Sequence, residues 1–306
     1  MLNGSRAPFV AAAVRWACRL DVQAAKPGNV SIASPGHGMR ADDFLASAEA
    51  VAGPLSAPGR SVGERIAEAV DATWKQVGMN TNLGIVLLAA PLAQAALTAR
   101  AGETFERATV RVLAELDADD AVHAFRAIVQ ANPAGLGEVE QCDVRHPAAT
   151  TTLLEAMRAA AHRDAIARQY ANGFGDVFRF GIPRLLAALR RHGSSTRATV
   201  DCYLGWLARF PDTHIARKYG IEVARQVSAE AAHIESGIGG SWAGLRAWDA
   251  SLKARALNPG TSADLTVASL FAARLQGAFA GRFFEADEPL APVRKVTWMH
   301  GTGLRE

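Results

Sequence analysis

The sequence predicts an all-α fold, a single compact bundle of about a dozen helices around one buried central helix. β-branched and aromatic residues are sparse, with Phe, Trp and Tyr together at 7%, and this composition disfavours sheets. Apolar residues recur at helical spacing, and no alternating pattern of useful length occurs. Residues 83–96 carry no charged side chain, and a helix that is apolar on every side must be buried among other helices.

Apolar spacing predicts three helices before the central one, over residues 8–25, 44–51 and 62–75. The Lys-Pro-Gly turn at 26–28 ends the first of them, because Pro and Gly interrupt helices. Asp42 or Asp43 can cap the second helix. Ser61 and Glu64 form a capping-box pattern at the start of the third.

The central helix has a sharply marked start. Asn80, Thr81 and Asn82 are all good N-cap residues, and they follow a small polar segment. Pro91 is expected to kink this helix or to end its first segment. Its N-terminal N–H groups open towards a polar loop, which is a favourable place for an anion.

The same spacing predicts eight further helices, over 102–116, 117–130, 150–170, 176–189, 199–209, 213–235, 242–256 and 262–280. Residues 135–146 form a loop rich in Gly and acid, and residues 293–298 are a short edge strand or tail. No linker forces a domain boundary, so we expect one helical domain over 1–285 and a C-terminal tail over 286–306.

Size and charge limit the class of protein. The 306 residues are enough for a sizeable core, and the net charge of +3 comes from bases scattered among acids, without a nucleic-acid footprint. Cys18, Cys142 and Cys202 are too far apart for a disulfide framework or a zinc ribbon. No uncharged stretch reaches membrane-spanning length, and the N-terminus is typical of a first helix rather than a signal peptide. We expect a cytoplasmic protein with no membrane or nucleic-acid partner and an undetermined oligomeric state.

Common catalytic motifs are absent. No G-x-x-x-x-G-K-[ST] sequence occurs, and the Gly-rich segments at 135–137 and 237–240 follow no strand. The triplet His162-Arg163-Asp164 matches a kinase catalytic loop in three letters only, and it falls in an expected helix interior. Cys142 and His146 have no second pair of ligands that would support a zinc site.

Five polar turns at expected helix ends remain, at 26–29, 37–43, 78–82, 212–218 and 258–264. Each has an ordinary structural explanation as a helix cap or a solvated charge. Together they supply cations, carboxylates and helix N-termini, which a polyphosphate site with a divalent metal requires.

The order of these turns resembles the triphosphoribosyl-dephospho-coenzyme A synthase family over about residues 26–275. The resemblance rests on Lys26-Pro-Gly, Phe44 with Ser47-Ala48, Asn80-Thr81 before Gly84, Asp212-Thr213 before Gly220, and Asn258-Pro-Gly-Thr-Ser-Ala-Asp-Leu265. It implies an all-helical enzyme that joins the ribose of ATP to the 2′-hydroxyl of 3′-dephospho-coenzyme A and releases adenine. ATP would be the donor substrate, dephospho-coenzyme A or a related molecule the acceptor, and Mg²⁺ the expected cation.

The chain also departs from the family pattern. Ser31 stands where the family usually has Asp, Leu83 where it has Lys, and Gly38 and Arg40 where it has acids, which are displaced here to Asp42 and Asp43. Two alternatives therefore stay open. One is a related ATP-dependent ribosyl transferase with another acceptor in tetrahydromethanopterin-linked one-carbon metabolism, and the other is a non-catalytic nucleotide-binding helical protein. An ordinary helical bundle with well-capped helices is the third reading.

The reaction implied by the resemblance suggests roles for the polar turns. Displacing adenine places positive charge on the ribose, as in glycoside cleavage. Asp212 is the first choice as general base and His37 the second, while Asp42, Asp43 and Asp264 would bind Mg²⁺ or face the ribose. We expect the remaining polar residues to bind the nucleotide, its phosphates above all; they are Lys26, Asn29, Asn80, Thr81, Asn82, Arg217, Lys218, Asn258 and Ser262.

Overall fold

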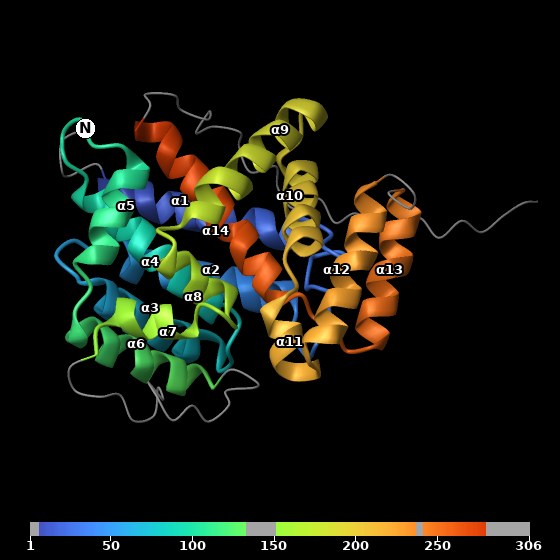
Figure 1. The fold of residues 1–306 in the computed structure, drawn as a ribbon, viewed down its shortest axis with the longest axis horizontal. Helices are drawn as coiled ribbons and strands as arrows, with labels where there is room; N and C mark the ends of the chain where they lie inside the picture. Colours follow the sequence, from blue (N-terminus) through green and yellow to red (C-terminus); the bar gives the residue numbers. More distant parts are fainter. Residues whose placement is uncertain (1–5, 133–150, 237–240, 280–306) are drawn as a thin grey trace, which may run out of the picture.

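The computed structural model describes residues 6–132, 151–236 and 241–279, and within them all regular structure is helical (Figure 1). The predicted loop 135–146 with Cys142 and His146, the turn at 237–240, the possible strand at 293–298 and the tail over 286–306 lie outside these residues. The helices are α1 Arg6–Gln23, α2 Ala41–Ser56, α3 Val62–Val77, α4 Leu83–Thr98, α5 Phe105–Ala114, α6 Ala118–Ala131, α7 Leu153–Ala160, α8 Ala165–Ala171, a π-helical turn Val177–Gly181, α9 Ile182–His192, α10 Ser195–Arg209, α11 Thr213–Tyr219, α12 Ile221–Glu235, α13 Trp242–Ala254 and α14 Gly260–Phe279.

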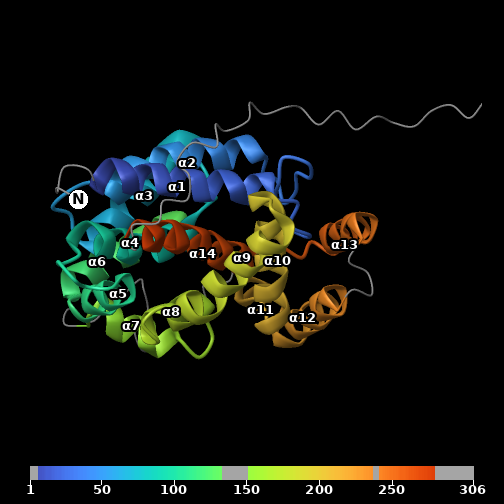
Figure 2. The ribbon, with the colours of Figure 1, turned by 90° about the horizontal axis from the view of Figure 1, so that it is seen from above.

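The predicted all-α class is confirmed, and α4 is the buried central helix. Leu88 and Leu92 are fully buried, and burial of each such side chain contributes about 1.5–3 kcal/mol. Seen from above, α4 and α14 lie between α1, α2 and α3 on one side and α5, α7 and α8 on the other (Figure 2). The centre of the bundle therefore holds two helices, because α14 is buried along most of its length as well.

Three predicted helices are wrong in detail. The segment 150–170 is split into α7 and α8, and 213–235 is split at Gly220, whose φ of +91° no helix accommodates. The segment 176–189 begins with the π-helical turn. Pro91 does not end α4, which continues to Thr98.

A second, smaller core packs α11, α12 and α13 against α10. Its buried side chains include Tyr203, Leu207, Ile215, Val227 and Leu252. Helices α12 and α13 stand side by side at one end of the molecule in both views (Figures 1 and 2). None of the described helices is both long and apolar enough to cross a membrane.

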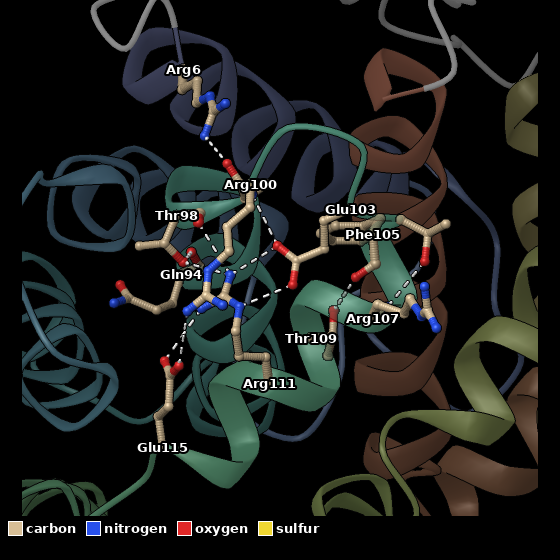
Figure 3. Close-up of polar contacts among 12 residues, drawn as sticks. Arg6, Gln94, Thr98, Arg100, Glu103, Phe105, Arg107, Thr109, Arg111 and Glu115 are labelled. Atoms are coloured by element: carbon tan, nitrogen blue, oxygen red, sulfur yellow. Dashed lines mark hydrogen bonds and ion pairs between the residues drawn. The ribbon is translucent and has the colours of Figure 1, made fainter.

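The C-terminal end of α4 is fixed by an ion pair in its connection to α5 (Figure 3). Arg111 donates to both carboxylate oxygens of Glu103, at 2.9 and 3.1 Å, and to the Thr98 carbonyl at 3.1 Å. Arg6 donates to the carbonyls of Leu97 and Ala99. The predicted polar turns lie at the opposite end of α4, about 24 Å away for a helix of 16 residues.

Candidate functional site

Asp212 fastens α11 to the start of α14. Its side chain is 2% exposed, and Oδ1 accepts hydrogen bonds from the backbone N–H groups of His214 and Ile215 at 2.9 and 3.1 Å. Oδ2 accepts from both the N–H and the hydroxyl of Ser262 at 2.8 Å. Burial raises the pKa of Asp212, and the donated hydrogen bonds oppose that shift. Asp212 is therefore the N-cap of α11, as its sequence position allowed, and all four of these contacts are structural.

Lys26 is buried behind the Lys-Pro-Gly turn. Its Nζ lies 2.7 Å from Asp21 Oδ1 on α1 and donates to Asn29 Oδ1 at 2.7 Å, and its side chain is 0% exposed. Asn29 in turn donates to Asn258 Oδ1 at 2.9 Å. Burial lowers the pKa of Lys26 and raises that of Asp21, while the opposite charge of each partner counteracts both shifts. The pair connects α1 through the turn to the start of α14.

Gly28 lets this turn pack closely against α13 and the residue that precedes α14. Its φ is +80°, and a Cβ there would lie 2.8 Å from Pro259 Cδ and 2.9 Å from Leu252 Cδ1. The Gly28 N–H donates to Asp249 Oδ1 at 2.8 Å, and Ser34 donates to the other oxygen of Asp249 at 2.5 Å. Asp21 and Asp249 are not among the residues that the sequence predicts for the site. Asp21 is recognisable as a carboxylate at an apolar position of the first helix, whereas no sequence pattern around Asp249 marks it.

Asp264 lies over the first turn of α4. A Cβ on Gly84 would fall 2.0 Å from Asp264 Oδ2, so the carboxylate occupies the space that a side chain would fill. Asp264 is half-buried and accepts no hydrogen bond from the described residues. Burial, followed by the charges of Asp21 and Asp212, raises the pKa of Asp264 well above its usual range, and Lys26 and Arg217 oppose this shift. A half-buried carboxylate thus faces the N-terminal end of the central helix.

The residues before α4 are held by side-chain hydrogen bonds to α2 and α3 as well as by one bond to the first turn of α4. Asn82 occupies the N-cap position without a capping bond, and Asn80 Oδ1 accepts from the Leu83 N–H at 3.1 Å instead. Asn82 accepts from Thr73 at 3.1 Å, and the hydroxyls of Thr81 and Ser47 lie 2.7 Å apart. The polar start of α4 is therefore rigidly connected to α2 and α3.

The other predicted side chains lie at the Lys-Pro-Gly turn, on α11 and at the start of α2. His37 Nε2 is 2.8 Å from the Gly28 carbonyl, and Lys218 lies over the ring of Tyr219. Arg40, not Asp42 or Asp43, is the N-cap of α2, because Asp43 accepts from the Arg40 N–H and completes a capping box from inside the helix. Among the described residues no three His, Cys, Asp or Glu side chains gather closely enough to hold a metal ion.

Three groups of contacts meet at the start of α14, between Asn258 and Asp264. Asn258 is joined to Asn29 and Lys26, Ser262 to Asp212, and Asp264 lies against Gly84 beside Asn80, Thr81 and Asn82. The positive charge of Arg217 lowers the pKa of Asp264, so Arg217 belongs to the same group. Asp43 is connected to the start of α4 through its carbonyl, which accepts from Ser47 Oγ at 2.6 Å, whereas no side-chain contact within the described residues brings Asp42 or Lys218 to the same point.

Comparison with known proteins points to one family. The chain is 25% identical to a candidate triphosphoribosyl-dephospho-CoA synthase from Archaeoglobus fulgidus whose crystal structure superposes with a TM-score of 0.61, over 76% of this chain and 99% of that one. It is 34% identical over 114 residues to a candidate 2-(5''-triphosphoribosyl)-3'-dephosphocoenzyme-A synthase from Stutzerimonas stutzeri, and this match spans 36% of the chain but only 39% of that relative's length. The family model for ATP:dephospho-CoA triphosphoribosyl transferases matches residues 7–283. Because that match covers most of the chain, including every residue of the candidate site, the chain belongs to the ATP:dephospho-CoA triphosphoribosyl transferase family.

Proposed function

We propose that the protein transfers the 5-triphosphoribosyl group of ATP to the 2′-hydroxyl of 3′-dephospho-coenzyme A. The observation that carries the proposal is Asp264, a half-buried carboxylate without a hydrogen-bond partner in the described part of the chain, at the point where the first turns of α4 and α14 meet. A carboxylate there attracts a developing positive charge, and the helix N-termini beside it favour phosphate.

The reaction forms one bond and breaks one. The acceptor 2′-oxygen bonds to C1′ of the ATP ribose, and the C1′–N9 bond breaks with its electron pair passing to adenine. The acceptor hydroxyl loses its proton to a base, and the departing adenine takes up a proton, which balances the reaction at N9. Positive charge on the ribose ring peaks between the two events, as in glycoside cleavage.

We assign the base and the stabilisation of ribose charge to Asp264. A raised pKa makes a carboxylate a better proton acceptor near neutral pH, and no donor among the described residues bonds to the Asp264 carboxylate. Asp212 was the first choice from the sequence, but its oxygens already accept four hydrogen bonds that join α11 to α14. Its role is then to hold Ser262 and Asp264 in place, and His37 remains a second candidate base.

Phosphate binding is assigned to the N-terminal end of α4 and to two basic residues of α11. Asn80, Thr81 and Asn82 present the N-terminal end of α4, and Arg217 and Lys218 supply cations. Lys26 has no exposed surface, so we assign it, with Asn29 and Asn258, to fixing the turn on which the nucleotide rests.

The chemistry of this donor set fits Mg²⁺ in the form usual for nucleotide sites, with one or two protein carboxylates and the remaining positions filled by phosphate and water. Asp264 would be the first such carboxylate, and Asp42 and Asp43, the acids in the first turn of α2, are the candidates for a second. The cation would neutralise triphosphate charge.

The test is adenine release from ATP, followed by chromatography, with Mg²⁺ and dephospho-coenzyme A present and the product identified by mass. We expect Asp264→Asn to lower turnover by about two orders of magnitude while leaving the unfolding midpoint nearly unchanged. Asp212→Asn should lower the stability by about 1–3 kcal/mol, because an amide NH₂ would face the donors of Ser262. Full turnover in Asp264→Asn would contradict the assignment.

Two other outcomes distinguish the alternatives. Adenine release without a ribosylated dephospho-coenzyme A would indicate a different acceptor, such as one from tetrahydromethanopterin-linked metabolism. ATP binding without adenine release would indicate a nucleotide-binding protein that does not catalyse transfer.

A further inference from the structure

Asp164 is the acid of the triplet at 162–164, and it lies in the break between α7 and α8 rather than inside a helix. Its Oδ1 accepts hydrogen bonds from the N–H groups of Ile166 and Ala167 at 2.8 and 3.0 Å, and so caps α8. Its Oδ2 lies 2.5 Å from Arg217 NH1 on α11. One carboxylate therefore fixes the start of a helix and the direction of an arginine 53 residues away.

The first turn of α8 is linked to three elements of the candidate site, α4, α11 and α14. The Ala165 N–H donates to Thr213 Oγ1 at 3.3 Å, and that hydroxyl lies 3.1 Å from Thr261 Oγ1 at the start of α14. A Cβ on Gly84 would lie 2.9 Å from Ile166 Cδ1, as well as against Asp264. Asp164 is thus anchored to the same turns of α4, α11 and α14 that hold the proposed nucleotide.

Arg217 retains donors for a ligand. Within the described residues its hydrogen bond to Asp164 uses only NH1, which leaves NH2 and Nε, and its side chain is 29% exposed. Its positive charge lowers the pKa of both Asp264 and His214, so the guanidinium lies beside the candidate site. An arginine held by a carboxylate on one edge presents its other edge in a fixed orientation, which suits phosphate oxygens.

We infer that Asp164 is a positioning residue that aims Arg217 at the triphosphate of the bound nucleotide. The inference rests on the proposed function for the identity of the nucleotide. The inference assigns a role to Asp164, which lies outside the five polar turns of the sequence. Asp164 itself does not touch the substrate.

Asp164→Asn is the direct test, because the amide oxygen can still cap α8 while the ion pair with Arg217 is lost. We expect the Kd for ATP, measured by calorimetry without acceptor, and the KM for ATP to rise about tenfold, with kcat and the KM for the acceptor nearly unchanged. Arg217→Gln should do the same. The Kd for ATP of the double variant should not exceed that of either single variant, because each single change already removes the same interaction. Asp164→Glu should recover part of the loss.

Asp176→Asn is the matched control. Asp176 pairs with Arg168 of α8 at 3.0 Å. The side chains of Arg168 and Asp176 are 33% and 26% exposed, against 29% and 23% for Arg217 and Asp164. An equal rise in the Kd for ATP in both variants, or additive effects in the double variant, would overturn the inference. Weakened ATP binding in Asp164→Asn together with no adenine release by the unmodified protein would reject the proposed reaction and retain the role of Asp164. If the unmodified protein does not bind ATP, both fail.

Discussion

Gly84 is the residue whose missing side chain makes the candidate site possible. Any Cβ there would fall on the Asp264 carboxylate and near Ile166. We predict that Gly84→Ala displaces the Asp264 carboxylate and lowers adenine release at least tenfold. Overpacking should also cost about 1–3 kcal/mol of unfolding free energy in urea titrations.

Gly53 provides the control for this substitution. It lies inside α2, and a Cβ there would meet no atom within 4 Å. Gly53→Ala should therefore leave turnover unchanged and raise the unfolding free energy by up to about 1 kcal/mol, the difference in helix propensity. Wild-type turnover in Gly84→Ala would show that the carboxylate position is not critical.

The sequence indicated the site residues that share a turn with a recognisable motif, such as Asn258 and Asp264. It could not indicate residues whose partners are remote. Asp249 accepts a hydrogen bond from the N–H of Gly28, which is 221 residues away in the sequence, and no pattern near Asp249 indicates this contact. Burial was also hidden, because Lys26 in a polar turn looks solvated until Asp21 is found 2.7 Å away.

Helix ends were harder to predict than helices. The apolar spacing continues through 161–164 and through Gly220, so periodicity alone joins α7 to α8 and α11 to α12. The breaks depend on tertiary contacts, since Asp164 caps α8 while also binding an arginine on another helix. Pro91 shows the opposite case: α4 continues beyond it because its neighbours bury both sides of the helix.

The connection between α4 and α5 provides a prediction about pH. Hydrogen bonds from Arg111, and then from the Arg100 N–H, lower the pKa of Glu103 from its ordinary 4.5 to about 2. The folded-state pKa is depressed, so the stabilisation is present above pH 4.5 and is lost as the pH falls towards 2. We expect a ¹³C-carboxyl NMR titration of Glu103 to show a midpoint near 2, and Arg111→Gln to move it up towards 4.5. An unshifted midpoint in the unmodified protein would show that the ion pair drawn in Figure 3 does not persist in solution.

At the scale of the molecule, the site joins the two cores. The Lys-Pro-Gly turn packs on Leu252 of the smaller core, and α14 carries Asp264 into the larger one. Asp212 lies between them, joining α11 to α14. Ligand binding at this junction should therefore restrain both parts together, although the contacting segments are far apart in sequence.

Hydrogen exchange measured with and without ATP and Mg²⁺ tests this arrangement. At a hundred times its Kd a ligand adds about 2.7 kcal/mol of stability, and the added protection should concentrate where the ligand restrains the chain. We predict slower exchange in four separate segments: the turn at 26–29, the start of α4, α11, and the first turns of α14. The α4–α5 connection, about 24 Å along α4, should change least. Protection of only one of the four segments would mean that these helix ends do not form a common site, since a nucleotide bound at one turn alone has no reason to slow exchange at the other three.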